Sequence, residues 1–302
     1  MKERFIMNGF LNILKPPGMT SHDVVSHVRK SFKIKKVGHL GTLDPGAAGV
    51  LPIAIGRATK FAEYIINQEK KYRFELILGE TTDTLDAQGV VTNQSEVTQE
   101  HINNLIENFS ELTGEISQVP PMYSAIKQKG KKLYELAREG QEVERPARQI
   151  KIYSLTLIDH YVFKGKTRFL FEVNCSKGTY IRTLGHDLAK LSGCGEGHVS
   201  FLLRSKSGDF DLNSSISLET LIKKSEELQS LIQPIDIPLN DFPSLVISDD
   251  KEIRKFRNGN VSFVSNHHTK NETLRVYNSQ NDFLGLGKVI SNNKVKPEKV
   301  IN

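Results

Sequence analysis

The run GHLGTLDPGAAGVLP at residues 38–52 places one carboxylate, Asp44, inside a glycine-rich segment. Glycine adopts main-chain conformations that other residues avoid, and its missing side chain allows a large partner to approach the backbone closely. Pro45 disfavours the helical region for the residue before it, so we expect Asp44 on an extended or turn segment rather than within a helix. An Asp-Pro step is also common in ordinary loops, so the run taken alone is equally compatible with a plain turn.

The charge around Asp44 favours a chemical role for it. Asp44 is the only acid between Asp23 and Glu63, in a segment rich in Lys and Arg. A lone carboxylate in positive surroundings is expected to remain ionised, and an ionised carboxylate can act as a nucleophile or stabilise developing positive charge. Asp44 is therefore a candidate catalytic residue.

Charge is distributed unevenly along the chain. Residues 1–60 hold ten Lys or Arg and three acids, whereas residues 80–119 hold eight acids and neither Lys nor Arg. We therefore expect one side or cleft of the protein, including the Asp44 loop, to be strongly positive. A positive cleft favours a polyanion, and nucleic acid is the leading candidate, although a run of charge can also be only a solvated face.

The chain of 302 residues is long enough for two domains, or for one large domain and a small one. Its two cysteines, Cys175 and Cys194, form neither a disulfide framework nor a metal-ligand pattern, so we expect both to be reduced and buried. The N-terminus lacks the apolar core of a signal peptide, and no apolar run approaches the length that spans a bilayer. The prediction is a cytoplasmic protein.

Hydrophobic periodicity predicts strands and helices in mixed order over the first 240 residues. The clearest strand is KKYRFELILG at 70–79, where Tyr72, Phe74 and alternate residues after them form one apolar face. Further strands are predicted in 9–18, 51–55, 150–162 and 167–175, and helices from Ser21 (which we expect to cap its helix), at 59–66, at 98–113, within 176–193 and from Ser217 to about Leu231.

Two stretches differ from this pattern. Residues 118–148 are basic, have little periodicity and contain interleaved tyrosines, which indicates an insertion or loop that can lie on RNA. From about residue 243 the chain changes to short strands and turns rich in Asn, Ser, Gly and Lys. This change predicts a small separate β-rich domain.

Six segments resemble, in order and content, the bacterial tRNA pseudouridine-55 synthases of the TruB type. They are LNILKPPGMTSHDVV (11–25), GHLGTLDPGAAGVLP (38–52), KKYRFELILGETTDTLDAQG (70–89), PPMYSAIKQKGKKLYELAREG (120–140), CSKGTYIRTLGHDLAKLSG (175–193) and HVSFLLRSKSGDF (198–210). The resemblance covers roughly residues 9–240. The C-terminal 60 residues resemble, more weakly, the PUA-type RNA-binding module that many members carry.

The resemblance implies an α/β (α+β) protein with the pseudouridine-synthase fold: a mixed, mainly antiparallel sheet flanked by helices, plus a small C-terminal β-rich PUA-like domain. The catalytic domain would span residues 1–240, with an RNA-contacting insertion at about 118–148. The PUA-like domain would span residues 244–302.

The resemblance also implies roles for individual residues. Asp44 occupies the place of the family's nucleophile, and Arg182 that of the arginine that pairs with it. Tyr72 matches the tyrosine that lies against the target base and assists its proton transfer. Three further positions would bind substrate, namely His39, which helps to hold the rearranged RNA loop, Tyr180, and Leu202, an apolar wall of the uracil pocket.

Two positions depart from the family pattern. Residue 40 is Leu where the family commonly has Thr, and Leu203 stands where a second basic residue usually precedes Arg204. Neither position is expected to touch the nucleophile, and Leu203 is expected at most to weaken one phosphate contact.

The implied reaction isomerises uridine to pseudouridine in the T-loop of tRNA, at position 55. The base leaves the stack, the N1–C1′ bond breaks, the uracil rotates, and the base rejoins the sugar through C5. Attack of the carboxylate at C1′, attack at C6, and a glycal route all remain open. The reaction needs no cofactor and no metal. The expected partner is the T-arm of tRNA, and neither a membrane nor an obligate protein partner is expected. The default expectation for the oligomeric state is a monomer.

Three other functions compete with this one. The first is the guide-RNA-dependent relative that modifies ribosomal RNA within a protein complex. The second is a non-catalytic RNA-binding or RNA chaperone protein that keeps the fold. The third is a carboxylate-dependent hydrolase, which needs a second acid beside Asp44; Asp83 and Asp86 are candidates by sequence only.

Overall fold

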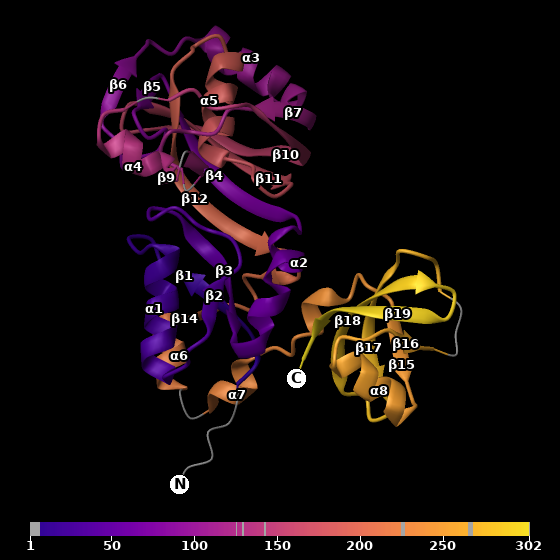
Figure 1. The fold of residues 1–302 in the computed structure, drawn as a ribbon. Coiled ribbons are helices and arrows are strands. Elements are labelled where there is room, and N and C mark those ends of the chain that lie inside the picture. The colour runs from indigo at the N-terminus through magenta and orange to yellow at the C-terminus, as the bar shows by residue number, and fades with distance from the viewer. Residues whose placement is uncertain are drawn as a thin grey trace.

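The computed structural model of the chain describes residues 7–124, 126–128, 130–141, 143–224, 227–264 and 268–301. Figure 1 shows a large N-terminal part, coloured indigo to orange, and a small C-terminal part, coloured orange to yellow, that is attached on one side of it. None of the described helices has the length and apolar composition needed to cross a membrane.

A mixed sheet is the framework of the large part. In the described residues its strands lie in the order β14 (Ile216–Ser217), β1 (Gly9–Lys15), β3 (Ala48–Ile55), β12 (Gly197–Ser207), β4 (Lys70–Leu78), β11 (Lys166–Cys175), β10 (Arg148–Phe163) and β7 (Gly114–Gln118), with β2 (Val37–His39) paired to β3 and β13 (Phe210–Asp211) paired to β12. Neighbours are antiparallel except β1 with β14 and β3 with β12, which are parallel. The expected mixed, mainly antiparallel sheet is therefore confirmed.

The alternation expected in residues 70–79 is the alternation of burial along β4, a central strand of this sheet. Tyr72, Phe74 and Leu76 are buried on one face, and Arg73 between them is exposed. Phe74 stacks on Phe171 of β11, with 5.4 Å between the ring centroids. A strand with one apolar face must bury that face against another layer, and helices supply this layer.

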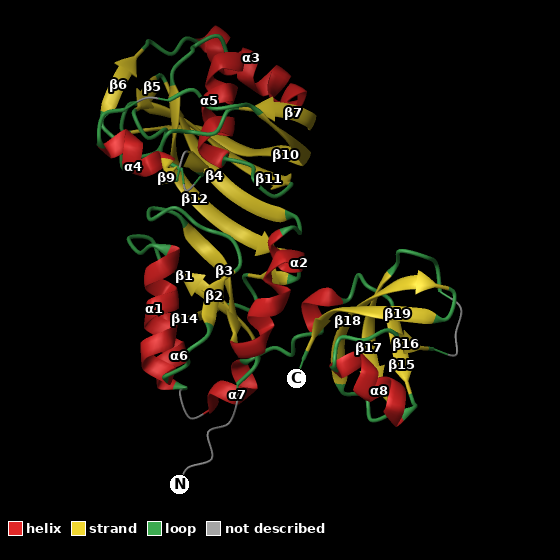
Figure 2. Cartoon of the chain, in the orientation of Figure 1, coloured by secondary structure: helices red, strands yellow, loops and turns green. Residues whose placement is uncertain are grey.

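Helices cover the sheet, as Figure 2 shows in red. The described helices of the large part are α1 (Ser21–Phe32), α2 (Ala62–Ile66) with the 3-10 turn η1 (Gly56–Phe61) before it, α3 (Gln99–Asn108) with η2 (Phe109–Leu112) after it, α4 (Leu133–Arg138), α5 (Ile181–Leu191), α6 (Leu218–Lys223), α7 (Leu228–Leu231) and η4 (Ile237–Leu239). Leu184 and Leu188 of α5 are fully buried in the same core as Phe74. Short hairpins complete this part, namely β5 (Glu80–Thr82) with β6 (Val91–Gln94), and β8 (Lys127–Gln128) with β9 (Lys131–Lys132).

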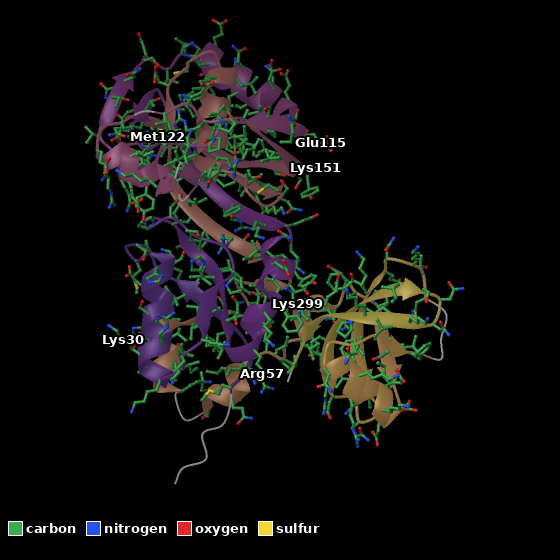
Figure 3. All side chains as sticks on the ribbon, viewed as in Figure 1. Lys30, Arg57, Glu115, Met122, Lys151 and Lys299 are labelled. Carbon is green, nitrogen blue, oxygen red and sulfur yellow. The ribbon has the colours of Figure 1, made fainter. Side chains whose placement is uncertain are left out.

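The C-terminal part has its own sheet, in the order β15 (Ser244–Ile247), β17 (Thr273–Asn278), β18 (Phe283–Ser291), β19 (Lys294–Val300) and β16 (Ser262–Phe263), with helix α8 (Asp250–Arg257) packed on it. It joins the large part through apolar and ionic contacts. The ring of Phe283 lies 5.8 Å from that of Phe61. Lys299, which Figure 3 labels at the junction, forms an ion pair of 2.8 Å with Glu63.

Some predicted elements need correction. Thr20, not Ser21, caps α1: its hydroxyl accepts from the backbone of Asp23, whose carboxylate accepts from the backbone of Thr20. In the residues that the structure describes, the helix expected from Ser217 to Leu231 is two short helices, α6 and α7; residues 225 and 226, which lie between them, are outside that description. Helix α8 was not predicted, although Asp249 caps it and Ile253 and Phe256 form its buried face. The stretch 118–148, read as lacking regular structure, contains α4 and the β8–β9 hairpin.

Candidate active site

The loop that carries Asp44 connects β2 to β3 and is held by its backbone. The N–H of Ala47 donates to the carbonyl oxygen of Asp44 at 3.1 Å, which closes a turn as the Asp-Pro step predicts. Beneath the loop, the fully buried ammonium of Lys15 donates to the carbonyl oxygens of Pro45 at 3.2 Å and Ala47 at 2.7 Å. Burial lowers the pKa of Lys15 to about 8, against the favourable charge of Asp44.

Asp44 and Arg182 form a two-pronged ion pair that joins the loop before β3 to the first turn of α5. Nε of Arg182 lies 2.9 Å from Oδ2 of Asp44, and Nη2 donates to Oδ1 at 3.1 Å. Arg182 is the second residue of α5 and its side chain is 4% exposed, whereas the side chain of Asp44 is 34% exposed. A planar guanidinium that holds both oxygens fixes the carboxylate in one orientation while one side of it stays open.

Arg182 has three further partners. Nη1 donates to the carbonyl oxygen of Thr84 at 3.0 Å, and Nη2 donates to that of Tyr123 at 2.7 Å. Oδ2 of Asp86 lies 3.5 Å from Nη1. The guanidinium therefore joins α5 to three other segments, namely the Asp44 loop, residues 84–86 and Tyr123, and its position depends on all of them.

Asp86 is the second acid of the site, and Asp83 is not. Oδ1 of Asp86 accepts from the hydroxyl of Thr84 at 2.7 Å and from the N–H of Gln88 at 3.0 Å, which directs its other oxygen to Arg182. Asp83 instead accepts from the N–H of Val90. The sequence named both acids as candidates, and the fold distinguishes between them.

Electrostatic effects on Asp44 oppose one another, and together they raise the pKa of its carboxyl, whereas the positive surroundings expected from the sequence would lower it. Burial in the cleft raises the pKa of the Asp44 carboxyl, the Arg182 guanidinium lowers it, and the charge of Asp86 raises it further. The positive surroundings expected from the sequence are present as Arg182 and Lys15. Asp44 is not the only carboxylate at the site, however, because the Arg182 guanidinium lies close to both Asp44 and Asp86.

Tyr72 and Arg204 are paired neighbours on β4 and β12. Burial raises the pKa of the Tyr72 hydroxyl, and the charge of Arg204 opposes that rise. The guanidinium of Arg204 is almost completely buried and donates to the carbonyl oxygens of Val50 at 2.7 Å and Gly41 at 3.1 Å. Arg204 thus ties the tyrosine to the loop that carries Asp44. The sequence analysis assigned no such role to Arg204. A signal was available, because Arg204 lies two positions after the predicted pocket residue Leu202, and residues two apart in a strand face the same side of the sheet.

A cavity of about 260 Å³ opens beside this ion pair. Asp44, Arg182 and Leu202 line it together with Asp86 and Gln88. A larger cavity of about 600 Å³ lies next to the C-terminal part, where Asp236 and Phe283 are among its lining residues, and none of the predicted site residues lines it. The smaller cavity is the candidate active site because it contains the oriented carboxylate.

Three of the predicted residues, Tyr72, Tyr180 and His39, are not among those that line the cavity. Tyr180 directly precedes α5; burial raises the pKa of its hydroxyl, and the charge of Asp44 adds to this effect. His39 ends β2, is half-buried, and has its pKa lowered by burial and by Arg204. Among the described residues, no cluster of three or more His, Cys, Asp or Glu side chains is arranged to hold a metal ion.

Comparison with known families identifies the chain. Residues 29–181 match the family model described as TruB family pseudouridylate synthase (N terminal domain). The chain belongs to the TruB family. Residues 182–240 match the tRNA pseudouridylate synthase B C-terminal domain, and residues 243–301 match the model called Pseudouridine synthase II TruB, C-terminal.

Relatives of this TruB-family chain match it over nearly their whole length. The tRNA pseudouridine synthase B of Caldanaerobacter subterraneus subsp. tengcongensis is 45% identical over 295 residues, which is 97% of this chain and 99% of the relative. That of Alkaliphilus oremlandii is 48% identical over 288 residues, or 93% of each chain. The predicted membership of the TruB family is confirmed.

Solved structures confirm the expected pseudouridine-synthase fold. A chain of the "Crystal Structure of a Cbf5-Nop10-Gar1 Complex" superposes with a TM-score of 0.73 at 26% identity, over 99% of this chain and 86% of that one. A chain of the "Crystal structure of the archaeal box H/ACA sRNP Nop10-Cbf5 complex" has a TM-score of 0.71 at 23% identity, over 98% and 86%, and shows the likeness of fold alone.

Proposed function

We propose that this protein isomerises uridine to pseudouridine at position 55, in the T-loop of tRNA. The observation that supports this function best is the two-pronged ion pair between Asp44 and Arg182 at the wall of a cavity, in a chain of the TruB family. The pair offers an oriented carboxylate with one accessible side, which a reaction at a sugar or base carbon requires.

The proposed reaction begins when the target uridine leaves the base stack and enters the cavity. Flipping costs a few kcal/mol, which the looped substrate reduces, and an aromatic ring against the base restores about 1–3 kcal/mol of stacking. Tyr72, which is buried beside Arg204 and is not among the residues that line the cavity, is the ring assigned to this contact by the family resemblance. Leu202 forms an apolar wall of the cavity. Tyr180 and His39 hold the RNA next to the flipped nucleotide.

Asp44 then acts on the nucleotide. The N1–C1′ bond breaks, the uracil turns, and C5 bonds to C1′; the hydrogen on C5 leaves as a proton, and N1 gains one. Attack of the carboxylate at C1′, attack at C6, and proton removal at C2′ in a glycal route all use the same oxygen. Arg182 favours the ionised carboxylate with which each route begins, and it holds that carboxylate at the wall of the cavity.

The charge pattern supports the choice of substrate. Residues 1–60 hold ten Lys or Arg and three acids. Lys30 on α1 and Arg57 on η1 belong to this basic segment, and Figure 3 labels both side chains. We assign residues 1–240 to the catalytic domain, 118–148 to an RNA-contacting insertion, and 244–302 to a PUA-like domain that extends RNA binding along the tRNA.

A second candidate is the guide-RNA-dependent enzyme. The likeness of fold to a chain of a Cbf5-Nop10-Gar1 complex favours it, at 26% identity. Relatives at 43–48% identity, all called tRNA pseudouridine synthase B, favour the stand-alone form. We therefore propose a cytoplasmic monomer that acts on tRNA without an obligate protein partner.

Tritium release tests the proposed function. Unmodified tRNA that carries uridine tritiated at C5 is incubated with the wild type and with Asp44→Asn, and the modified position is mapped. Asp83→Asn is the matched control, because it changes an acid of the same region that accepts from the N–H of Val90 and the hydroxyl of Tyr123 and not from Arg182. We expect release by the wild type and the control, mapped to position 55, and none by Asp44→Asn. Near-normal turnover by Asp44→Asn would rule out the assigned nucleophile.

That assay also separates the competing functions. Tight binding of tRNA by the wild type without release of tritium would favour the non-catalytic RNA-binding protein. Release that requires an added guide RNA and protein partners would favour the second candidate.

A further inference from the structure

Helix α5, which carries Arg182, begins without a capping side chain of its own. Tyr180 is the residue at the cap position, and its side chain makes no capping hydrogen bond. The cap comes from Gln118 on β7. The N–H of Tyr180 donates to Oε1 of Gln118 at 2.8 Å, and Nε2 of Gln118 donates to the carbonyl oxygen of Tyr180 at 3.1 Å.

The position of Gln118 makes this contact rigid. Gln118 is 2% exposed, so both ends of its amide are bonded away from water. A buried amide that both donates to and accepts from one residue fixes the backbone of that residue in two directions. Tyr180 lies two positions before Arg182, so the same contact also fixes the backbone from which the Arg182 side chain extends.

Gln118 also stands at the root of the 118–148 insertion. It is the last residue of β7, and it pairs with Arg148 on β10, where the chain returns to the sheet. Within the insertion, the carbonyl oxygen of Tyr123 accepts from Nη2 of Arg182 at 2.7 Å. The insertion and Arg182 are therefore connected twice, once through the helix start and once directly.

We propose that Gln118 is a positioning residue for Arg182: it couples the root of the insertion to the helix start that directs the guanidinium onto Asp44. The inference rests on the proposed function, because it assigns the insertion to RNA and the ion pair to catalysis. A shift of the helix start by a fraction of an ångström changes the two-pronged geometry, and the chemical step depends on it far more than tRNA binding does.

Two substitutions separate the two bonds. Gln118→Met keeps the length of the side chain and removes both bonds, whereas Gln118→Glu keeps the acceptor for the N–H of Tyr180 and removes the donor. Asn12→Leu is the matched control. Asn12 is a buried amide in the same domain, 3% exposed, whose bonds at 2.7 and 2.8 Å go to Asp211 and Ser214, away from Arg182.

The measurements are the single-turnover rate of tritium release, the Kd for tRNA, and the thermal midpoint of each variant. We expect Gln118→Met to react about tenfold or more slowly, while its Kd stays within about twofold of the wild type. Gln118→Glu is expected to release tritium at a rate between those of the wild type and Gln118→Met. Asn12→Leu is expected to lose thermal stability without loss of rate.

Several results would overturn the inference. One is a rate of tritium release by Gln118→Met equal to that of the wild type. Another is an equal fall in rate in Asn12→Leu when both variants have lost the same thermal stability. A third is a Gln118→Met variant that binds tRNA more weakly but reacts at the wild-type rate once bound. If Gln118→Met does not fold, Gln118→Glu decides the question by the same two criteria. Failure of the wild type to release tritium is a different outcome, since it contradicts the proposed function itself.

Discussion

Ser21 and Leu43 form a reciprocal pair of hydrogen bonds that joins α1 to the Asp44 loop. The N–H of Leu43 donates to Oγ of Ser21 at 2.8 Å, and Oγ donates to the carbonyl oxygen of Leu43 at 3.1 Å. Ser21 is 2% exposed and Leu43 4%, so water cannot replace either bond. The residue before Asp44 is thereby fixed to the first turn of a helix.

We expect Ser21→Ala to weaken both the fold and the active site. The substitution leaves a buried N–H and a buried carbonyl oxygen without their partner, which costs about 1–3 kcal/mol of unfolding free energy. It also frees the loop that carries Asp44, so turnover should fall more than tRNA affinity. Urea denaturation and tritium release measure the two effects. Ser26→Ala, on the same helix, is the control and is expected within about 0.5 kcal/mol of the wild type; equal effects of the two substitutions would contradict the assigned role.

We expect Asp86→Asn to move the acid limb of the pH–rate profile to lower pH. The charge of Asp86 raises the pKa of Asp44 and competes for Arg182. An amide removes that charge, so the Asp44 carboxyl should lose its proton at a lower pH. The profile of kcat/KM between about pH 4 and 8 measures the shift. Asp83→Asn should leave the acid limb in place, and a limb that moves upward in Asp86→Asn would refute the prediction.

Burial of Lys15 predicts a stability that rises with pH. The pKa of Lys15 is lowered from 10.5 to about 8 in the folded protein. Between these values the unfolded chain keeps the proton and the folded chain has released it, so the free energy of unfolding increases with pH across this window. The gain is at most about 1.4 kcal/mol per pH unit.

Urea denaturation of the wild type and of Lys15→Met between pH 8 and 10.5 measures this effect of Lys15. The free energy of unfolding of the wild type minus that of Lys15→Met should increase as pH rises. Lys30→Met, which changes an exposed lysine, should show the same pH dependence of unfolding free energy as the wild type. A difference between wild type and Lys15→Met that does not change with pH would show that Lys15 keeps its proton.

The uneven charge of the chain predicts that tRNA affinity falls steeply with salt. A protein that neutralises six to ten phosphates loses about a thousandfold or more in affinity between about 50 and 200 mM salt. Filter binding over this range measures the slope of log K against log salt concentration. Asp44→Asn should have the same slope, since it changes no phosphate contact. A flat dependence would contradict binding of tRNA through the basic residues of the first 60 positions.

Local elements follow from short-range rules, and most were predictable. Alternation identified β4, and Pro45 placed Asp44 on a turn, because both effects act within a few residues. Helix α8 escaped prediction because only Ile253 and Phe256 of its eight residues are buried, which is a weak periodic signal within a charged segment. The cap of α1 was placed one residue late because Thr20 and Ser21 are both good capping residues by sequence.

The sequence by itself determined the strands and helices of most of the chain, the family, and the candidates Asp44, Tyr72 and Arg182. Only the tertiary structure decided which groups surround them. It joined Gln118 to Tyr180 across 62 positions, and it chose Asp86 over Asp83. Periodicity and turn chemistry act over neighbouring residues, whereas a buried polar group finds its partner only after the sheet and helices have packed and excluded water.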